Sequence, residues 1–227
     1  MTILHFSLLR SIRRKSTLLL LILWPSIILP IKPFWTSEVG LGFSFFGMTI
    51  LLGAFILVRS IIEDRQSRVI VRIFIAPITT FQYLFQNLLC YLILLTMQIL
   101  VFIFIGSLLY NWNFTMTVEL MLGYILFAAT SISFSLAWNS LFKSKAASDG
   151  LFSILVSIMA LLGGIYIPVS NLPDVLQPIS MLFPTYWLSS IILDIRNLDA
   201  PFDIWTSIAV LILFTVAFLI FGSKRRL

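Results

Sequence analysis

The residues that could do chemistry in this 227-residue sequence do not complete an enzyme site. Polar side chains gather within one apolar stretch, at Ser131, Ser133, Ser135, Asn139 and Ser140. A nucleophilic serine needs a base within hydrogen-bond reach, and the only histidine, His5, is far away in the chain. Three alanines, Ala128, Ala129 and Ala137, lie among these residues. The cluster therefore indicates close helix packing first, with a polar stripe facing a substrate as the alternative.

The sequence also has no complete motif for binding a nucleotide or a metal ion. A phosphate-binding loop has the pattern Gly-x-x-x-x-Gly-Lys-Ser/Thr. The only glycine followed closely by a lysine is Gly222, at the end of the last apolar stretch. The single cysteine, Cys90, cannot form an intramolecular disulfide or a cysteine-built metal site. We therefore expect no catalytic residue, metal or cofactor in this chain, and any ATP that drives it must be hydrolysed by another polypeptide.

One charged segment has a pattern that suits contact with a partner. Its charged residues come first, its apolar residues follow and a proline ends it, which predicts a short helix along the cytoplasmic membrane surface within residues 63–80. A partner motor could hold such a helix, and an anchor to anionic lipid is the alternative. The residues that carry the pattern are Glu63, Asp64, Arg65, Arg68, Arg72, Ala76 and Pro77.

A second segment combines glycines and prolines with large apolar residues. Paired glycines allow the chain to leave a helix tightly, and the prolines stop and restart helices. We expect an outer gate whose Pro184-to-Trp187 step plugs the outer mouth, and a simple proline-broken loop is the alternative. The gate residues are Gly163, Gly164, Pro168, Leu172, Pro173, Pro184 and Trp187.

The composition shows which elements must position these residues. Hydrophobic residues make up 60% of the chain and charged residues 11%, whereas soluble domains have roughly a quarter charged residues. About 20 apolar helical residues cross a bilayer. The sequence predicts six such spans, at residues 17–36, 41–62, 84–109, 118–142, 150–167 and 202–222.

The remaining segments of this single permease domain, residues 1–227, are predicted not to cross. Residues 1–16 are amphipathic and should form an interfacial helix. Prolines interrupt residues 168–197, so we expect a re-entrant helical hairpin on the outer face. All of the 15 lysines and arginines except Lys32 and Arg196 fall on the side that holds both ends of the chain. By the positive-inside rule, both termini are cytoplasmic in a multi-pass protein of the plasma membrane.

These features together resemble the permeases of the ABC-2 type exporter family. Glu63, Asp64 and Arg65 with Ala76 and Pro77 match the family's layout after the second span. Gly163 to Pro173, followed by Pro184 and Trp187, is similar to its Gly-Gly, Leu-Pro and Pro-x-x-Trp signature. The resemblance implies an all-α, type V exporter-like fold in which residues 1–16 form a connecting helix and residues 63–80 couple to an ATPase.

The resemblance also implies the partners and the function. Two copies of a separate ATPase would bind ATP and Mg. A second permease subunit, either another copy in a homodimer or a sister permease, would complete the complex among membrane lipids, with no nucleic acid. The apolar composition favours export of an amphipathic or hydrophobic cargo such as a peptide, a drug or a lipid-like molecule. Two alternatives from other classes remain: a non-transporting immunity or scaffold protein, and an ion-coupled carrier. The carrier is disfavoured because all charged residues lie at or near the predicted span ends.

Overall fold

The computed structural model describes residues 8, 27, 29–36, 41–62, 79–142, 144–196, 198 and 200–224. Every element among these residues is a helix, and none is a strand. The helices are α3 (Lys32–Thr36), α4 (Leu41–Val58), α7 (Thr80–Tyr110), α8 (Phe114–Leu141), α9 (Lys145–Leu162), η1 (Val169–Asn171), α10 (Gln177–Ser180), α11 (Pro184–Ile195) and α12 (Ile204–Lys224).

Five of the described helices are long and apolar enough to cross a membrane. They are α4 with its continuation to Ile62, α7, α8, α9 and α12. The shortest, α9, has 18 residues, which span about 27 Å at 1.5 Å each and nearly match a bilayer core of about 30 Å. Most of the predicted first span, of the interfacial helix and of residues 63–80 lies outside the described residues, so six spans remain a prediction.

The observed helix bounds differ from the expected ones most clearly at α9, which was expected at 150–167. It begins five residues earlier and ends five residues earlier, at Leu162. The early end follows from Gly163 and from Gly164, whose φ of 81° is left-handed and ends the helix. α7, which was expected from residue 84, also begins early, because Thr79 before it and Gln82 in its first turn form a capping box.

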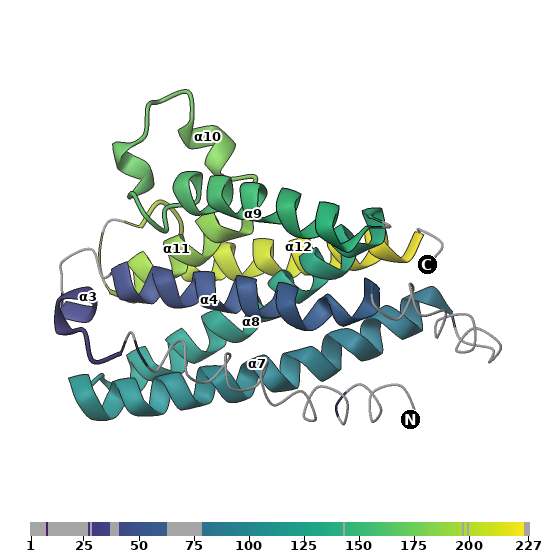
Figure 1. Ribbon diagram of the computed structural model, residues 1–227. Helices are drawn as coiled ribbons and strands as arrows, with labels where there is room; N and C mark the ends of the chain where they lie inside the picture. Colours follow the sequence, from purple (N-terminus) through teal and green to yellow (C-terminus); the bar gives the residue numbers. More distant parts are fainter. Residues whose placement is uncertain are drawn as a thin grey trace.

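The long helices form a bundle with α8 at its centre (Figure 1). α8 packs against α4, α7, α11 and α12. The loop between α9 and α12 carries η1, α10 and α11, and we name the end of the bundle where it lies the hairpin end, at the left of Figure 1. Lys224 lies at the opposite end, which we name the C-terminal end. α9 arrives at the hairpin end and α12 leaves from it.

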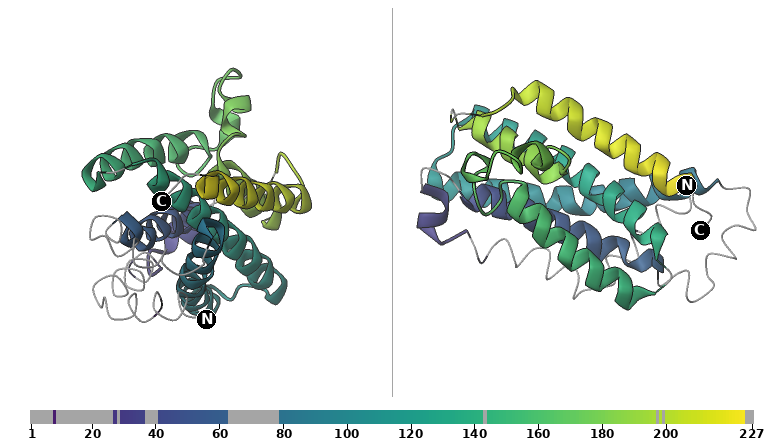
Figure 2. Two further views of the ribbon diagram at one scale, coloured as in Figure 1. Left: turned by 90° about the vertical axis from the view of Figure 1, so that its right-hand side faces the viewer. Right: turned by 90° about the horizontal axis from the view of Figure 1, so that it is seen from above.

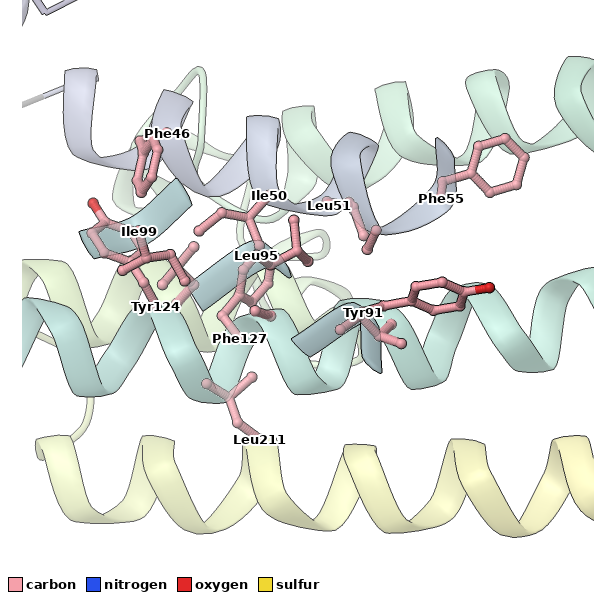
Figure 3. Packing of buried hydrophobic residues seen from close by; sticks show 14 of the residues in the cluster. Phe46, Ile50, Leu51, Phe55, Tyr91, Leu95, Ile99, Tyr124, Phe127 and Leu211 are labelled. Carbon is pink, nitrogen blue, oxygen red and sulfur yellow. The ribbon is translucent and has the colours of Figure 1, made fainter. Parts of the chain in front are cut away.

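Apolar side chains from four helices fill the space around α8 (Figure 3). Phe46 of α4, Ile99 of α7, Phe127 of α8 and Leu211 of α12 are all buried there. Lipid is as apolar as these side chains, so close packing and interhelical hydrogen bonds hold such helices together. One such bond joins α8 to α4, where the Tyr124 hydroxyl donates to the Phe43 carbonyl at 2.9 Å.

Candidate functional site

One long helix, α9, is set apart from the others, and the end-on view of Figure 2 shows it leaning away from the bundle. Only 28% of its most apolar stretch is buried, compared with 67% for α8. The corresponding stretch of α12 is 17% buried, but α12 packs closely along α8. Its inward side is formed by Ser148, Phe152, Val156, Met159 and Ala160.

The opposite side of α9 presents large apolar residues to the surroundings. They recur at helical spacing, so they share one face, which we name the bare face. Ile154 alone is 60% exposed. Ser153 and Ser157 are exposed beside it, and each donates its hydroxyl hydrogen to a carbonyl of its own helix. The bare face consists of Leu151, Ile154, Ile158 and Leu161.

Polar contacts attach α9 at the C-terminal end of the bundle. Arg59, just beyond α4, pairs with Asp149 at 2.6 Å between Nη2 and Oδ2. The Ser148 hydroxyl donates to Asn139 Oδ1 of α8 at 2.9 Å, and Trp138 Nε1 donates to the Ser148 carbonyl at 3.3 Å. We name these five residues the polar junction. The polar junction links α4, α8 and α9. Its residue Arg59 stands shortly before residues 63–80 in the sequence.

Between its ends, α9 packs on the bundle through Phe152, Val156 and Met159, all of which are buried. The ring of Phe152 stacks on Phe55 of α4 at 3.7 Å between centroids. The same ring lies 6.0 Å from Phe134 and 5.9 Å from Trp138 of α8. These contacts leave the bare face uncovered.

Hydroxyl groups of α11 attach α9 at the hairpin end. Thr185 Oγ1 donates to the Met159 carbonyl at 2.8 Å, and Ser189 Oγ donates to the Gly163 carbonyl at 2.9 Å. The Met159 carbonyl also accepts from the Gly163 backbone N–H at 2.8 Å, so Thr185 adds a second donor there. Ser189 supplies a partner to the carbonyl of Gly163, the residue that caps the helix. A Cβ on Gly163 would overlap Thr185 Oγ1, so glycine is required for this approach. We name Met159, Gly163, Thr185 and Ser189 the hairpin junction.

The predicted gate residues divide into two groups in space. The first group lies where α9 meets α11 and consists of Gly163, Gly164, Pro184 and Trp187. Pro184 is the first residue of α11. Trp187 is buried, and its Nε1 donates to the Met181 carbonyl at 2.8 Å. The other three, Pro168, Leu172 and Pro173, lie in the projecting segment that carries η1 and α10 (Figure 1). The gating role of both groups stays a prediction.

The far end of α11 connects to two further helices. Asp194 Oδ2 accepts a hydrogen bond from the Ile204 backbone N–H at 3.0 Å, at the start of α12. The Arg196 guanidinium lies over the Phe43 ring, 5.6 Å from its centroid. Partial burial lowers the pKa of Arg196 from its usual value. α11 therefore contacts α9 at one end and α4 and α12 at the other.

Sequence reasoning missed the ion pair of the polar junction. Arg59 was counted only as a topology signal, and Asp149 received no role. The sequence does carry a signal for this pair. Arg59 follows the end of one apolar helix, and the oppositely charged Asp149 lies near the start of another. Ser189 was missed as well, since a hydroxyl within an apolar helix does not reveal its partner.

The predicted coupling residues lie outside the described residues, so their role remains a prediction. They are Glu63, Asp64, Arg65, Arg68, Arg72, Ala76 and Pro77.

The small polar cluster of α8 has a clearer outcome. Ser131, Ser133, Ser135 and Asn139 are buried within the bundle. Ser133 and Ser135 donate to carbonyls of their own helix, at 2.8 Å to Ala129 and to Ser131 respectively. Their burial agrees with close helix packing. These four residues do not form a polar stripe on the surface of the described bundle.

Comparison with known proteins gives one family match. The model of a family described as "ABC-2 family transporter protein" matches residues 36–224. No curated protein matches the chain. The matched range includes all five candidate spans, both junctions of α9 and residues 63–80.

Proposed function

The chain belongs to the ABC-2 family of transporter proteins, and from this premise we propose that it is the permease of an ATP-driven exporter in the plasma membrane. In this proposal both termini face the cytoplasm, and a separate ATPase, present in two copies, binds ATP and Mg. Residues 63–80 are the segment that contacts this ATPase. The permease itself has no catalytic role.

The observation that carries the proposal is the state of α9. It is long enough to cross the bilayer, yet its bare face is uncovered, and polar contacts fix it at its two ends. Lipid can cover an apolar face, but the exposed Ser153 and Ser157 also allow another helix to approach closely. We infer that two copies meet with their α9 helices toward each other, with the transport path between them.

The polar junction supplies a route for the motion. Arg59 lies four residues before Glu63 in the sequence, so a movement of residues 63–80 reaches Asp149 through the ion pair. α9 is rigid along its length as a helix, so its far end moves with it. There, Thr185 and Ser189 pass the motion to α11 and to the buried Trp187. The outer mouth opens or closes in response.

The lining of the path indicates the cargo. The described part of α9 has no charged side chain between Gly150 and Leu162. Large apolar residues with interspersed serines suit an amphipathic or hydrophobic molecule, such as a peptide, a drug or a lipid-like compound, which leaves the cytoplasm or the inner leaflet. A small ion would need charged or carbonyl ligands along the path.

The test is ATP-driven transport by the reconstituted complex. The chain is co-expressed with an ABC ATPase from a neighbouring reading frame, purified and placed in vesicles with a fluorescent amphipathic peptide. We expect transport that requires ATP, and loss of both co-purification and transport when Glu63, Asp64 and Arg65 are reversed in charge. Reversal of Asp174, in the projecting segment of the hairpin, is the matched control and should change neither.

Each alternative function predicts a different result. An immunity or scaffold protein would protect cells equally with an ATPase-dead partner. An ion-coupled carrier would transport cargo under an ion gradient without nucleotide. Either result would contradict the exporter proposal.

A further inference from the structure

A groove opens between α8 and α12 at the C-terminal end of the bundle. It has a volume of about 350 Å³, within the range of ligand-binding pockets. Its walls are apolar, and the two alanines create the hollow between larger side chains. Seven residues line it: Phe134, Ala137, Trp138 and Leu141 of α8, and Ala217, Phe218 and Phe221 of α12.

Neighbouring contacts fix the shape of this groove. Gly222 lets α12 approach the backbone of α8 at Ala137, where an added Cβ would lie 3.4 Å from the Ala137 Cα. Phe134 lies 5.1 Å from Phe218 of α12 and 6.0 Å from Phe152 of α9, between ring centroids. The groove therefore lies between α8 and α12, and Phe134 on its wall also lies near Phe152 of α9.

The charge at the mouth of the groove indicates what occupies it. Ala217, Phe221 and Lys224 follow one another at spacings of four and three, so they lie on one face of α12. Lys224 is exposed one turn beyond Phe221, at the end of the helix. Arg225 and Arg226 follow in the sequence. Asp149, at the start of α9, already pairs with Arg59.

We propose that this groove binds the acyl chain of an anionic phospholipid whose headgroup lies against Lys224. Basic residues beside a pocket between membrane helices favour anionic headgroups, and the apolar walls receive the hydrocarbon. The inference rests on the membrane location and orientation proposed above and requires no transport activity. A defect in lipid binding is therefore distinguishable from a failure of the exporter proposal.

The test uses Trp138 as a reporter in the purified full chain. Phosphatidylglycerol or phosphatidylcholine with brominated acyl chains is titrated in micelles, and bromine quenches nearby tryptophan fluorescence. The difference between the parent and Trp138→Phe isolates the Trp138 signal. The difference between the parent and Trp205→Phe gives a reference at the hairpin end, where Trp205 is 77% exposed.

We expect phosphatidylglycerol to quench Trp138 at a lower mole fraction than phosphatidylcholine. Lys224→Gln should reduce this preference about fivefold. The matched control Lys32→Gln, an exposed lysine at the hairpin end, should leave it unchanged. Ala217→Phe fills the groove from an exposed position and should abolish Trp138 quenching by both lipids, whereas Val216→Phe, one residue away on α12, should not.

Equal quenching of Trp138 by the two lipids in the parent would overturn the proposal. So would unchanged quenching in Ala217→Phe, or a disulfide between two copies of Ala217→Cys, which would assign the groove to a second copy of the chain. If Trp138→Phe does not fold, native mass spectrometry of Ala217→Phe and Val216→Phe decides by the number of phosphatidylglycerol molecules retained. Equal numbers in the two variants would count against the groove.

Discussion

α8 and α9 are both long enough to cross the bilayer, but they differ in how the protein surrounds them. α8 has neighbours on nearly every side, and its small polar residues are buried. α9 is attached by a junction at each end and packs between them on one side only, through Phe152, Val156 and Met159. A helix at the centre of many contacts cannot move without disturbing all of them, whereas a helix packed on one side only can tilt as a unit. In the proposed mechanism, α8 is therefore the fixed axis and α9 the mobile element.

Truncating one large apolar side chain in each helix should give the largest contrast. Phe127 of α8 is fully buried, so Phe127→Ala should lower the free energy of unfolding by about 3–5 kcal/mol. Ile154 of α9 faces outward, so Ile154→Ala should cost little in the monomer and weaken association of two copies. Unfolding in detergent and size measurement in mild detergent test the pair. Equal destabilisation by the two changes would contradict the comparison.

The glycines of α9 offer a second contrast. An added Cβ at Gly163 overlaps Thr185, so Gly163→Ala should destabilise the protein by about 1–3 kcal/mol. Nothing lies within 4 Å of a Cβ on Gly150, and alanine favours helix there, so Gly150→Ala should stabilise the protein by up to about 1 kcal/mol. Thermal unfolding followed by tryptophan fluorescence measures both. A stable Gly163→Ala protein would show that α11 need not approach α9 closely.

Removing one hydroxyl from the hairpin junction should have a smaller effect. Thr185→Val keeps the shape of the side chain and removes its bond to the Met159 carbonyl, which should cost about 1 kcal/mol. The control Ser153→Ala removes an exposed hydroxyl that bonds only within α9 and should change stability by less than about 0.5 kcal/mol. Chemical unfolding resolves this difference. A silent Thr185→Val would mean that packing alone joins the two helices.

The ion pair of the polar junction should matter least for stability and more for coupling. Partly exposed pairs contribute about 0.2–1 kcal/mol, so Arg59→Asp and Asp149→Arg should each unfold at nearly the parental temperature. Each single change should nevertheless uncouple ATP hydrolysis from transport, and the double exchange should restore the ratio of cargo moved to ATP hydrolysed. Failure of the exchange to restore coupling would leave the pair with a structural role only.

The sequence alone was sufficient to predict five of the long helices, because runs of apolar residues bounded by charges leave few other structures possible in lipid. It also identified Gly163, whose lack of a side chain is needed for the contact with Thr185. It could not place α9 apart from the bundle, because in a membrane protein residues facing lipid and residues facing protein are similarly apolar. The hydrogen bonds of Ser148 and Ser189 were equally out of reach, since they depend on how helices distant in sequence come together.

The short helix α11 constrains how the chain is made. It has 12 residues, and ten of them are buried against other parts of the protein. A helix of this length is too short to span the membrane on its own. Its final position depends on α12, because Asp194 accepts a hydrogen bond from the first residue of α12. α12 is synthesised after α11. α11 must therefore wait at the translocon or at the membrane surface until synthesis reaches α12. A released chain truncated after Ile195 should leave α11 open to proteases, whereas the chain through Leu227 should protect it.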